Sequence, residues 1–121
     1  MSSVFANILQ IAVTRTPGAV GGAFAARDGE IVDSFANADP LEWAFLTAHY
    51  GVVLSQIQAA LRTFHYGEAQ LVLMSHDELD ILLHAVSEGY YALLAVGHPA
   101  PLALAIDALT SAAASLRKEM E

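Results

Sequence analysis

The sequence contains no cysteine and few basic residues, and each shortage excludes a class of protein. Without cysteine there is no disulfide framework, no thiolate nucleophile and no cysteine-ligated zinc or iron–sulfur site. Five Lys and Arg stand against thirteen Asp and Glu, a net charge of −8, which excludes nucleic-acid binding through a basic field. The lack of cysteine fits a reducing compartment, so we expect a cytoplasmic protein with no nucleic-acid partner.

Long hydrophobic runs are missing as well. The two longest charge-free stretches extend from Trp43 to Leu61 and from Gly89 to Ile106. The first contains a histidine, a serine and two glutamines, and Pro99 and Pro101 break the second, so neither is expected to insert into a membrane. The first seven residues lack the basic region and the continuous apolar run of a signal peptide.

Apolar residues are what the chain has in excess. They make up 55% of the 121 residues, while charged residues make up 15%, against roughly a quarter in average domains. This composition excludes a disordered chain, and the length predicts a single domain over residues 1–121. A monomer of this size has difficulty burying so much apolar surface, which favours an assembly.

The first part of the chain predicts a helix followed by a β-hairpin. Ser2 or Ser3 is the expected N-cap of a helix of about three turns, which ends at Thr16-Pro17-Gly18. The strands on either side of Asp28-Gly29 are expected to join through a two-residue turn. Gly21 and Gly22 within the first strand indicate a bulge or a close approach by a packed helix.

The remainder predicts a long helix, three strands and a closing helix. Asp39-Pro40 begins a helix over residues 41–64, and short apolar runs predict antiparallel strands over residues 71–74, 79–86 and 90–96. Pro99-Ala100-Pro101 precedes a final helix whose apolar residues recur at spacings of three and four. The expected element order is α-β-β-α-β-β-β-α.

The middle helix is predicted to be apolar on two sides. A helical wheel assigns a broad face to the sheet: Trp43, Leu46, Tyr50, Val53, Leu54, Ile57, Ala60, Leu61 and Phe64. The opposite side carries small residues that admit a second helix closely, which predicts a dimer interface at Ala44, Ala48, Gly51, Val52, Ser55 and Ala59. The alternative is an alanine-rich helix in a chain with 23 alanines.

Several local patterns, taken in order, are similar to those of a known family. They are residues 17–23 with their three glycines, the hairpin at residues 27–34, the runs at 79–86 and 89–96, and the final amphipathic helix. In this order and spacing they resemble the Roadblock/dynein light chain family, a relative of the longin and profilin-like α/β sandwiches. The resemblance covers nearly the whole chain.

The resemblance implies a fold and a dimer. The fold is an α/β (α+β) sandwich, with a five-stranded antiparallel sheet in the order 2-1-5-4-3, the middle helix on one face and the terminal helices on the other. The homodimer it implies is joined through the middle helix and the third strand. The helical wheel reached helix pairing independently. In the implied strand order the third strand is an uncharged edge, a liability that pairing removes, which adds Leu71, Val72, Leu73 and Met74 to the expected interface.

The sequence does not indicate a catalytic, metal or cofactor site within the chain. The five histidines show no spacing for a metal site, and no Gly-Lys-Ser/Thr follows Gly18, Gly21 and Gly22 as a phosphate loop requires, so we expect no metal and no cofactor. His84 is expected to be a hydrogen-bonded core or interface histidine. A solvated turn is the expected setting of the acidic cluster Asp77, Glu78, Asp80 and Glu88.

Bacterial members of the resembled family regulate Ras-like GTPases. The resemblance therefore implies a homodimeric regulator or scaffold that binds a small Ras-like GTPase and has no catalytic activity. Polar residues flanking the helix seam are the expected partner-binding positions: His49, Gln56, Arg62 and Thr63. Arg27 and Arg62 are candidates for an arginine finger, with a solvated or salt-bridged arginine as the alternative. Two other functions stay open, a dimerisation module that recruits a non-GTPase complex and a small-ligand sensor domain.

Overall fold

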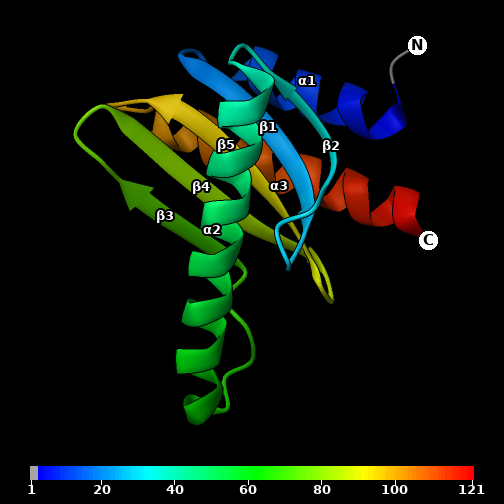
Figure 1. The fold of residues 1–121 in the computed structure, drawn as a ribbon, viewed down its shortest axis with the longest axis vertical. Helices are drawn as coiled ribbons and strands as arrows, with labels where there is room; N and C mark the ends of the chain where they lie inside the picture. Colours follow the sequence, from blue (N-terminus) through cyan, green and yellow to red (C-terminus); the bar gives the residue numbers. More distant parts are fainter. Residues whose placement is uncertain (1–2) are drawn as a thin grey trace.

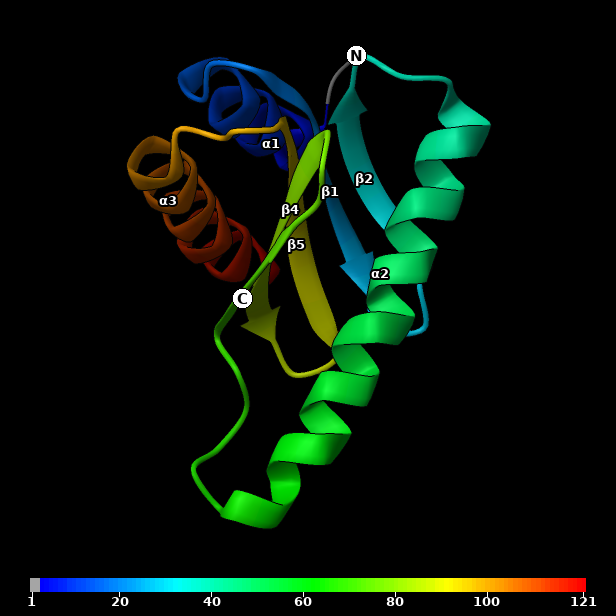
Figure 2. The same ribbon diagram turned by 90° about the vertical axis from the view of Figure 1, so that its left-hand side faces the viewer.

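An antiparallel sheet of five strands separates one helix from two others. In the computed structural model, which describes residues 3–121, the elements are α1 (Val4–Arg15), β1 (Ala19–Ala26), β2 (Ile31–Ala36), α2 (Pro40–Leu61), the 3-10 helix η1 (Arg62–Phe64), β3 (Leu71–Ser75), β4 (Leu79–Ser87), β5 (Tyr90–Gly97) and α3 (Leu102–Met120). The strand order is β2-β1-β5-β4-β3, and every neighbouring pair is antiparallel. Helices α1 and α3 pack on one face of the sheet and α2 on the other (Figure 1 and Figure 2). The predicted fold class, element order and strand order are confirmed.

Polar caps fix the helix starts. The Ser3 hydroxyl accepts a hydrogen bond from the N–H of Ala6 at the start of α1, while the other candidate cap, Ser2, lies outside the described residues. The Asp39 carboxylate accepts hydrogen bonds from the N–H groups of Leu41 and Glu42 at the start of α2. These caps place both helices within about a turn of their predicted positions.

The turn between β1 and β2 differs from the prediction. The N–H of Gly29 donates to the carbonyl of Ala26, the N–H of Ala26 donates to the carbonyl of Glu30, and Gly29 has a φ of 93°. This is a three-residue loop in which Gly29 alone takes positive φ, so the predicted two-residue turn is wrong. The Asp28 carboxylate accepts the N–H of Glu30, which favours this longer turn.

Gly21 is required by close packing, as predicted. A Cβ atom there would lie 2.5 Å from the Cβ of Ala36 and 3.0 Å from the Cη2 of Trp43 in α2. The pairing of β1 with β5 also shifts register between Ala19 and Gly21. Both the bulge and the close approach of a helix are therefore present.

Side chains on the two faces of the sheet form two separate cores. Alternation along β4 sends Leu82 and Val86 into the core under α1 and α3, and Ile81 and Leu83 into the core under α2. Both layers are filled largely by Leu, Ile, Val, Ala and aromatic side chains. The second core sets the orientation of α2, and this in turn decides which α2 side chains reach the surface.

The sheet-facing side of α2 overlaps the predicted one only in part. Leu46 and Tyr50 pack against the core as predicted, but the centre of the buried side is shifted. Five residues of the helix are buried: Trp43, Thr47, Gly51, Leu54 and Gln58. Of the predicted face only Trp43 and Leu54 are among them, and Phe64 is exposed. The helix is therefore rotated so that small and polar residues face the sheet.

Tyr91 of β5 explains this rotation. Its hydroxyl donates to the backbone carbonyl of Thr47 at 2.8 Å, and a Cβ at position 51 would lie 2.6 Å from the Tyr91 oxygen. A buried hydroxyl needs a partner, and only glycine at position 51 leaves room for this one. Burial, and secondly the negative charge of Asp28, raises the pKa of Tyr91 to about 12.

Gln58 fixes the return from α2 to the sheet. Its side-chain amide donates to the carbonyl of Ala69 at 3.1 Å and accepts from the N–H of Ala69 at 2.8 Å. This buried side chain satisfies both backbone groups of one loop residue. It therefore holds the chain just before β3 against the far end of α2.

Asp80 of β4 is a structural residue, which corrects its predicted place in a solvated acidic turn. Asp80 is 3% exposed. Its carboxylate accepts hydrogen bonds from the Ser75 hydroxyl at 2.7 Å, the N–H of Ala100 at 3.0 Å and Nδ1 of His98 at 2.9 Å. The bonds from Ser75, Ala100 and His98, in that order, outweigh desolvation and lower the pKa of Asp80 to about 2. The other three acidic residues of the cluster are exposed.

Replacing Gly51 tests the packing of α2 on Tyr91. In an exposed helix interior, Gly→Ala stabilises by about 1 kcal/mol. We expect Gly51→Ala instead to lower the free energy of unfolding by about 1–3 kcal/mol, because its Cβ overlaps the Tyr91 hydroxyl. Combining Gly51→Ala with Tyr91→Phe should recover at least about 1 kcal/mol of that loss in urea denaturation. An equal loss of unfolding free energy from Gly51→Ala in wild type and in Tyr91→Phe would contradict the contact between Gly51 and the Tyr91 hydroxyl.

Replacing Asp80 tests the lowered pKa. Its native pKa of about 2 lies below the ordinary 3.8, so Asp80 stabilises the fold above pH 4, and this stabilisation is lost as the pH falls towards 2. In Asp80→Asn an NH₂ group replaces one acceptor oxygen beside three donors. We expect a lower Tm at pH 7 and a smaller fall of Tm between pH 4 and 2. Exposed Asp77→Asn is the control, and an unchanged pH profile in Asp80→Asn would refute the assignment.

Candidate interaction surface on α2 and β3

The side of α2 that faces away from the sheet carries large apolar side chains. Leu41, Phe45 and Val52 are 67%, 70% and 54% exposed, and together with His49 and Gln56 they form what we call the outer face of α2. Their spacing follows one side of the helix. Contiguous exposed apolar residues of this kind mark interaction sites on soluble proteins.

A groove lies beside the outer face. It has a volume of about 280 Å³ and is formed by Leu41, Ala44, Phe45 and Ala48 together with Gly29 of the β1–β2 turn. A Cβ at Gly29 would lie 3.0 Å from Ala48, so the turn packs directly on the helix. The groove gives a partner side chain a pocket in which to be buried, as interaction hot spots require.

The predicted helix-interface residues separate into three groups. Val52 and Ala59 are exposed, and Ala44, Ala48 and Ser55 are half-buried along one flank of the outer face. Gly51 is buried beneath Tyr91, so its assignment to the interface is corrected. The wheel placed it outside because small residues were all assigned to one side.

Leu41 and Phe45 are the surface residues that the sequence reasoning missed. The signal was available, since the 100° projection that groups Val52 with Ala59 also groups them with Leu41 and Phe45. The interface was assigned from the spacing of small residues, and this criterion leaves out Leu41 and Phe45. These two side chains are the largest apolar groups on the outer face.

The four predicted partner-binding residues are all exposed. His49 and Gln56 lie on the outer face, two turns of the helix apart. Arg62 and Thr63 lie in η1, at the end of α2 that extends past the sheet (Figure 1). The structure thus makes them accessible without bringing all four into one cluster.

Strand β3 is an open edge of the sheet. It pairs only with β4, and Leu71 and Leu73 are partly exposed on the side of α1 and α3. Val72 and Met74 point to the other face and pack against the core under α2. The unpaired backbone of an uncharged strand is a template for another strand.

Tyr50 and His76 connect the helix to this edge. The Tyr50 hydroxyl and Nε2 of His76 lie 3.0 Å apart, and Nδ1 of His76 is 3.0 Å from the carbonyl of Leu79. The carbonyl requires a donor, so the proton lies on Nδ1 and Nε2 accepts from tyrosine when the ring is neutral. The contact ties α2 to the β3–β4 turn.

Few positive charges are available for a partner. Arg15 pairs with Asp107 at 2.8 Å and Arg27 with Glu68 at 2.9 Å, so the salt-bridged alternative is confirmed for Arg27. Arg117 donates to the carbonyl of Val86. Within residues 3–121, Arg62 has no carboxylate within 4.0 Å, which leaves its guanidinium exposed at the tip of α2.

Histidines and acids are not gathered for metal binding. Over the described part of the chain, no group of three or more His, Asp and Glu side chains is arranged to hold an ion. His84 is half-buried with Nδ1 2.7 Å from the carbonyl of Ala85, consistent with the predicted hydrogen-bonded histidine. His98 serves Asp80 instead.

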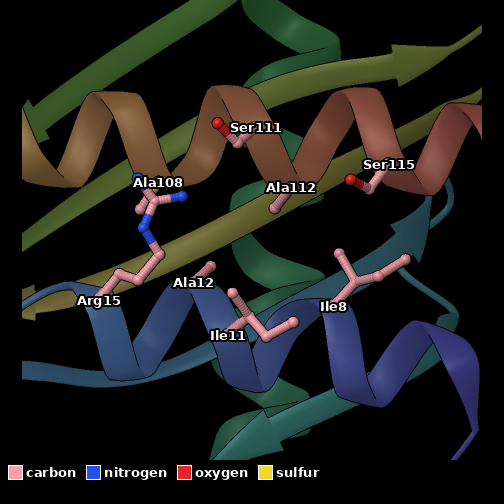
Figure 3. A pocket seen from close by; sticks show the side chains of 8 residues that line it. All are labelled: Ile8, Ile11, Ala12, Arg15, Ala108, Ser111, Ala112 and Ser115. Carbon is pink, nitrogen blue, oxygen red and sulfur yellow. The ribbon is translucent and has the colours of Figure 1, made fainter.

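A second groove lies between α1 and α3. Ala12, Ala108 and Ala112 bring the two helices together, and Arg15 reaches from α1 towards α3 (Figure 3). Its volume of about 140 Å³ is below the roughly 300 Å³ at which pockets for drug-sized ligands begin. It therefore reflects helix packing.

No helix among residues 3–121 has the length and apolar character to cross a membrane.

Comparison with known proteins gives matches in structure alone. No protein-family model and no curated protein matches the sequence. Among solved structures, a Roadblock/LC7 domain from Streptomyces avermitilis aligns with a TM-score of 0.87 and 17% identity over 95% of this chain and 96% of that one. The gliding protein MglB from Thermus thermophilus aligns with a TM-score of 0.84 and 14% identity over 98% and 92% of the two chains.

A third similar structure is MglC from Myxococcus xanthus. It aligns with a TM-score of 0.69 and 24% identity over 95% of this chain and 98% of that one. All these identities are low while nearly the full length of each chain is matched, so the likeness is one of fold. The chain has the Roadblock/LC7 fold, as the resemblance of its sequence implied.

Proposed function

We propose that this chain is a homodimeric, non-catalytic regulator or scaffold that binds a small Ras-like GTPase. The observation that carries the proposal is the presence of two uncovered surfaces, the apolar outer face of α2, with Phe45, Leu41 and Val52 exposed, and the open edge of β3. The sequence resemblance and the Roadblock/LC7 fold support it. One similar structure is of MglB in a tetrameric arrangement, so a protein of this fold assembles.

The dimer is proposed because one twofold interface covers both surfaces. Antiparallel pairing of two β3 strands satisfies their free backbone groups, and the α2 helices then come together above the joined sheet. Fully burying a Leu, Val or Phe side chain contributes about 1.5–3 kcal/mol, and twofold symmetry counts each one twice. Leu41, Phe45 and Val52 thus supply apolar surface for a stable pair.

The GTPase is proposed to bind across both copies. In a dimer, paired α2 helices form a composite surface that one chain does not have, with His49 and Gln56 flanking the seam between the helices and Arg62 and Thr63 at its ends. A polar rim around an apolar centre is the usual anatomy of a protein interface. No side chain of this surface is arranged for chemistry of its own, so the action proposed is on the partner.

Two alternatives differ in what they would bind. A dimerisation module for a non-GTPase complex would use the same surfaces, and only binding experiments separate it from the proposal. A small-ligand sensor would need an internal cavity with converging polar groups. The described residues instead fill both cores with apolar side chains, and no observation favours the sensor.

Charge placed on the outer face tests the dimer. Val52 is exposed in one copy, so Val52→Glu should leave each copy folded, whereas in a dimer it would bury an unpaired carboxylate at a cost of about 3–5 kcal/mol. We expect wild type to run as a dimer in light scattering at micromolar concentration and Val52→Glu as a monomer. Thr110→Glu, on the exposed side of α3, is the matched control. A monomeric wild type, or a dimeric Val52→Glu, would rule out this interface.

Arg62 tests the contact with a GTPase. The partner is a Ras-like GTPase co-purified from the native source in the presence of a GTP analogue. We expect Arg62→Ala to weaken binding by about tenfold, the effect of losing one docking contact of about 1.4 kcal/mol, with the dimer unchanged. Arg15→Ala, an exposed arginine of α1, is the control.

Other outcomes assign different roles. A fall of about a thousandfold in stimulated GTP hydrolysis with binding intact would make Arg62 an arginine finger. A dimer that binds no GTPase in any nucleotide state would refute the regulator and favour the dimerisation module.

A further inference from the structure

The opposite edge of the sheet has a different character from β3. Strand β2 pairs only with β1, so its outer side is open, at the far side of the sheet from β3 (Figure 1). Beside it, a groove of about 310 Å³ lies between β2 and the start of α2, formed chiefly by Ile31, Ser34, Phe35, Pro40 and Trp43. The groove runs along a free strand, the geometry that strand addition uses.

Trp43 brings an unused donor to this groove. The residue is 4% exposed, and its indole N–H has no hydrogen-bond partner among the described residues. A buried N–H without a partner costs free energy that an incoming acceptor recovers. Trp43 lines the groove, so a bound chain would lie close to this donor, which the protein itself covers.

The backbone of β2 offers donors at the same edge. The N–H of Ser34 donates to the Asp33 carboxylate at 2.9 Å, so it points to the open side of the strand and not to β1. Asp33 also accepts from the Ser3 hydroxyl. A carboxylate held over the edge protects it from indiscriminate pairing. A strand that binds here must displace the Asp33 carboxylate, and the displaced negative charge then requires a new partner.

The surroundings of the edge are mainly acidic, and the arginine of the β1–β2 turn, Arg27, is already paired with Glu68. Residues 28–61 contain five acidic side chains and no Lys or Arg, the acids being Asp28, Glu30, Asp33, Asp39 and Glu42. They lie in the β1–β2 turn, in β2 and at the start of α2, on the elements that frame the groove. Charge complementarity therefore selects a basic occupant.

A second copy of this chain does not meet that requirement. None of its five strands contains a Lys or Arg residue. Pairing two copies through β2 would place one acidic edge against another, which like charges oppose. The occupant that fits is a segment of a different protein.

We propose that the β2 edge is a docking site for an extended basic segment of a partner protein, which adds to the sheet as a sixth strand. Its backbone carbonyl accepts the N–H of Ser34, its apolar side chains enter the groove at Ile31 and Trp43, and a Lys or Arg pairs with the displaced Asp33 carboxylate. A neutral or acidic strand would leave Asp33 without a partner, so this residue selects for positive charge. The site is independent of α2's outer face and of the proposed GTPase.

Two synthetic peptides test the proposal on the intact protein. One alternates valine with lysine and the other valine with glutamate, both with blocked ends. Trp43 is the single tryptophan, so its fluorescence and its indole N–H resonance report on the groove directly. We expect the lysine peptide to bind at least about tenfold more tightly, with NMR shifts in β2 and at the Trp43 indole.

Three variants locate the binding. Ser34→Pro removes an outward N–H at an edge position where proline is tolerated, so it should abolish binding while circular dichroism shows the fold retained. Asp33→Asn keeps every backbone donor. It should weaken binding of the lysine peptide by about tenfold and should not weaken binding of the glutamate peptide. Asp77→Asn, in the β3–β4 turn, removes the same charge elsewhere and should change nothing.

Several results would overturn the proposal. They are equal affinity for the two peptides, no binding at about 1 mM, NMR shifts on β3 in place of β2, or a loss of binding in Asp77→Asn equal to that in Asp33→Asn. A change of oligomeric state in Ser34→Pro would show that a second copy occupies the edge, which also contradicts it.

Discussion

The hydrogen bond from Tyr91 to the carbonyl of Thr47 sets the orientation of α2, and the surfaces of the protein follow from that orientation. The tyrosine is buried in the middle of the sheet and can satisfy its hydroxyl only on the helix backbone, which is possible because Gly51 has no side chain. With Thr47, Gly51 and Gln58 turned inwards, Leu41, Phe45 and Val52 are turned outwards. A polar requirement in the core thereby creates an apolar surface outside it.

The two edge strands of the sheet differ in charge, so they suit two different kinds of binding partner. Strand β3 is uncharged and has leucine side chains partly exposed, a combination suited to a copy of itself. Strand β2 carries Asp33 across its outer backbone and is framed by acidic residues, a combination that resists self-pairing and favours a basic chain. Self-association and partner docking can therefore take place at opposite ends of one sheet.

Buried polar side chains hold the segments on which these surfaces depend. Gln58 fixes the approach to β3 through Ala69, and Asp80 joins the β3–β4 turn to the loop before α3 through Ser75 and Ala100. Asp80 was expected in a solvated turn, and glutamine side chains such as that of Gln58 are mostly exposed in proteins. Their roles depend on groups 11 and 20 residues away, which no local pattern reveals.

The sequence by itself determined the elements and their order along the chain, because hydrophobic periodicity, proline and glycine positions and helix caps act over a few residues. The place of β3 at an edge of the sheet was implied by the family resemblance and is confirmed. The sequence also made His49, Gln56, Arg62 and Thr63 recognisable as exposed positions on or beyond α2. Only the tertiary structure decided which side of α2 meets the sheet. That helix is apolar on every side, so its own pattern assigns no direction, and the choice was made by Tyr91 and Gly51, which lie 40 residues apart and meet only in the folded chain.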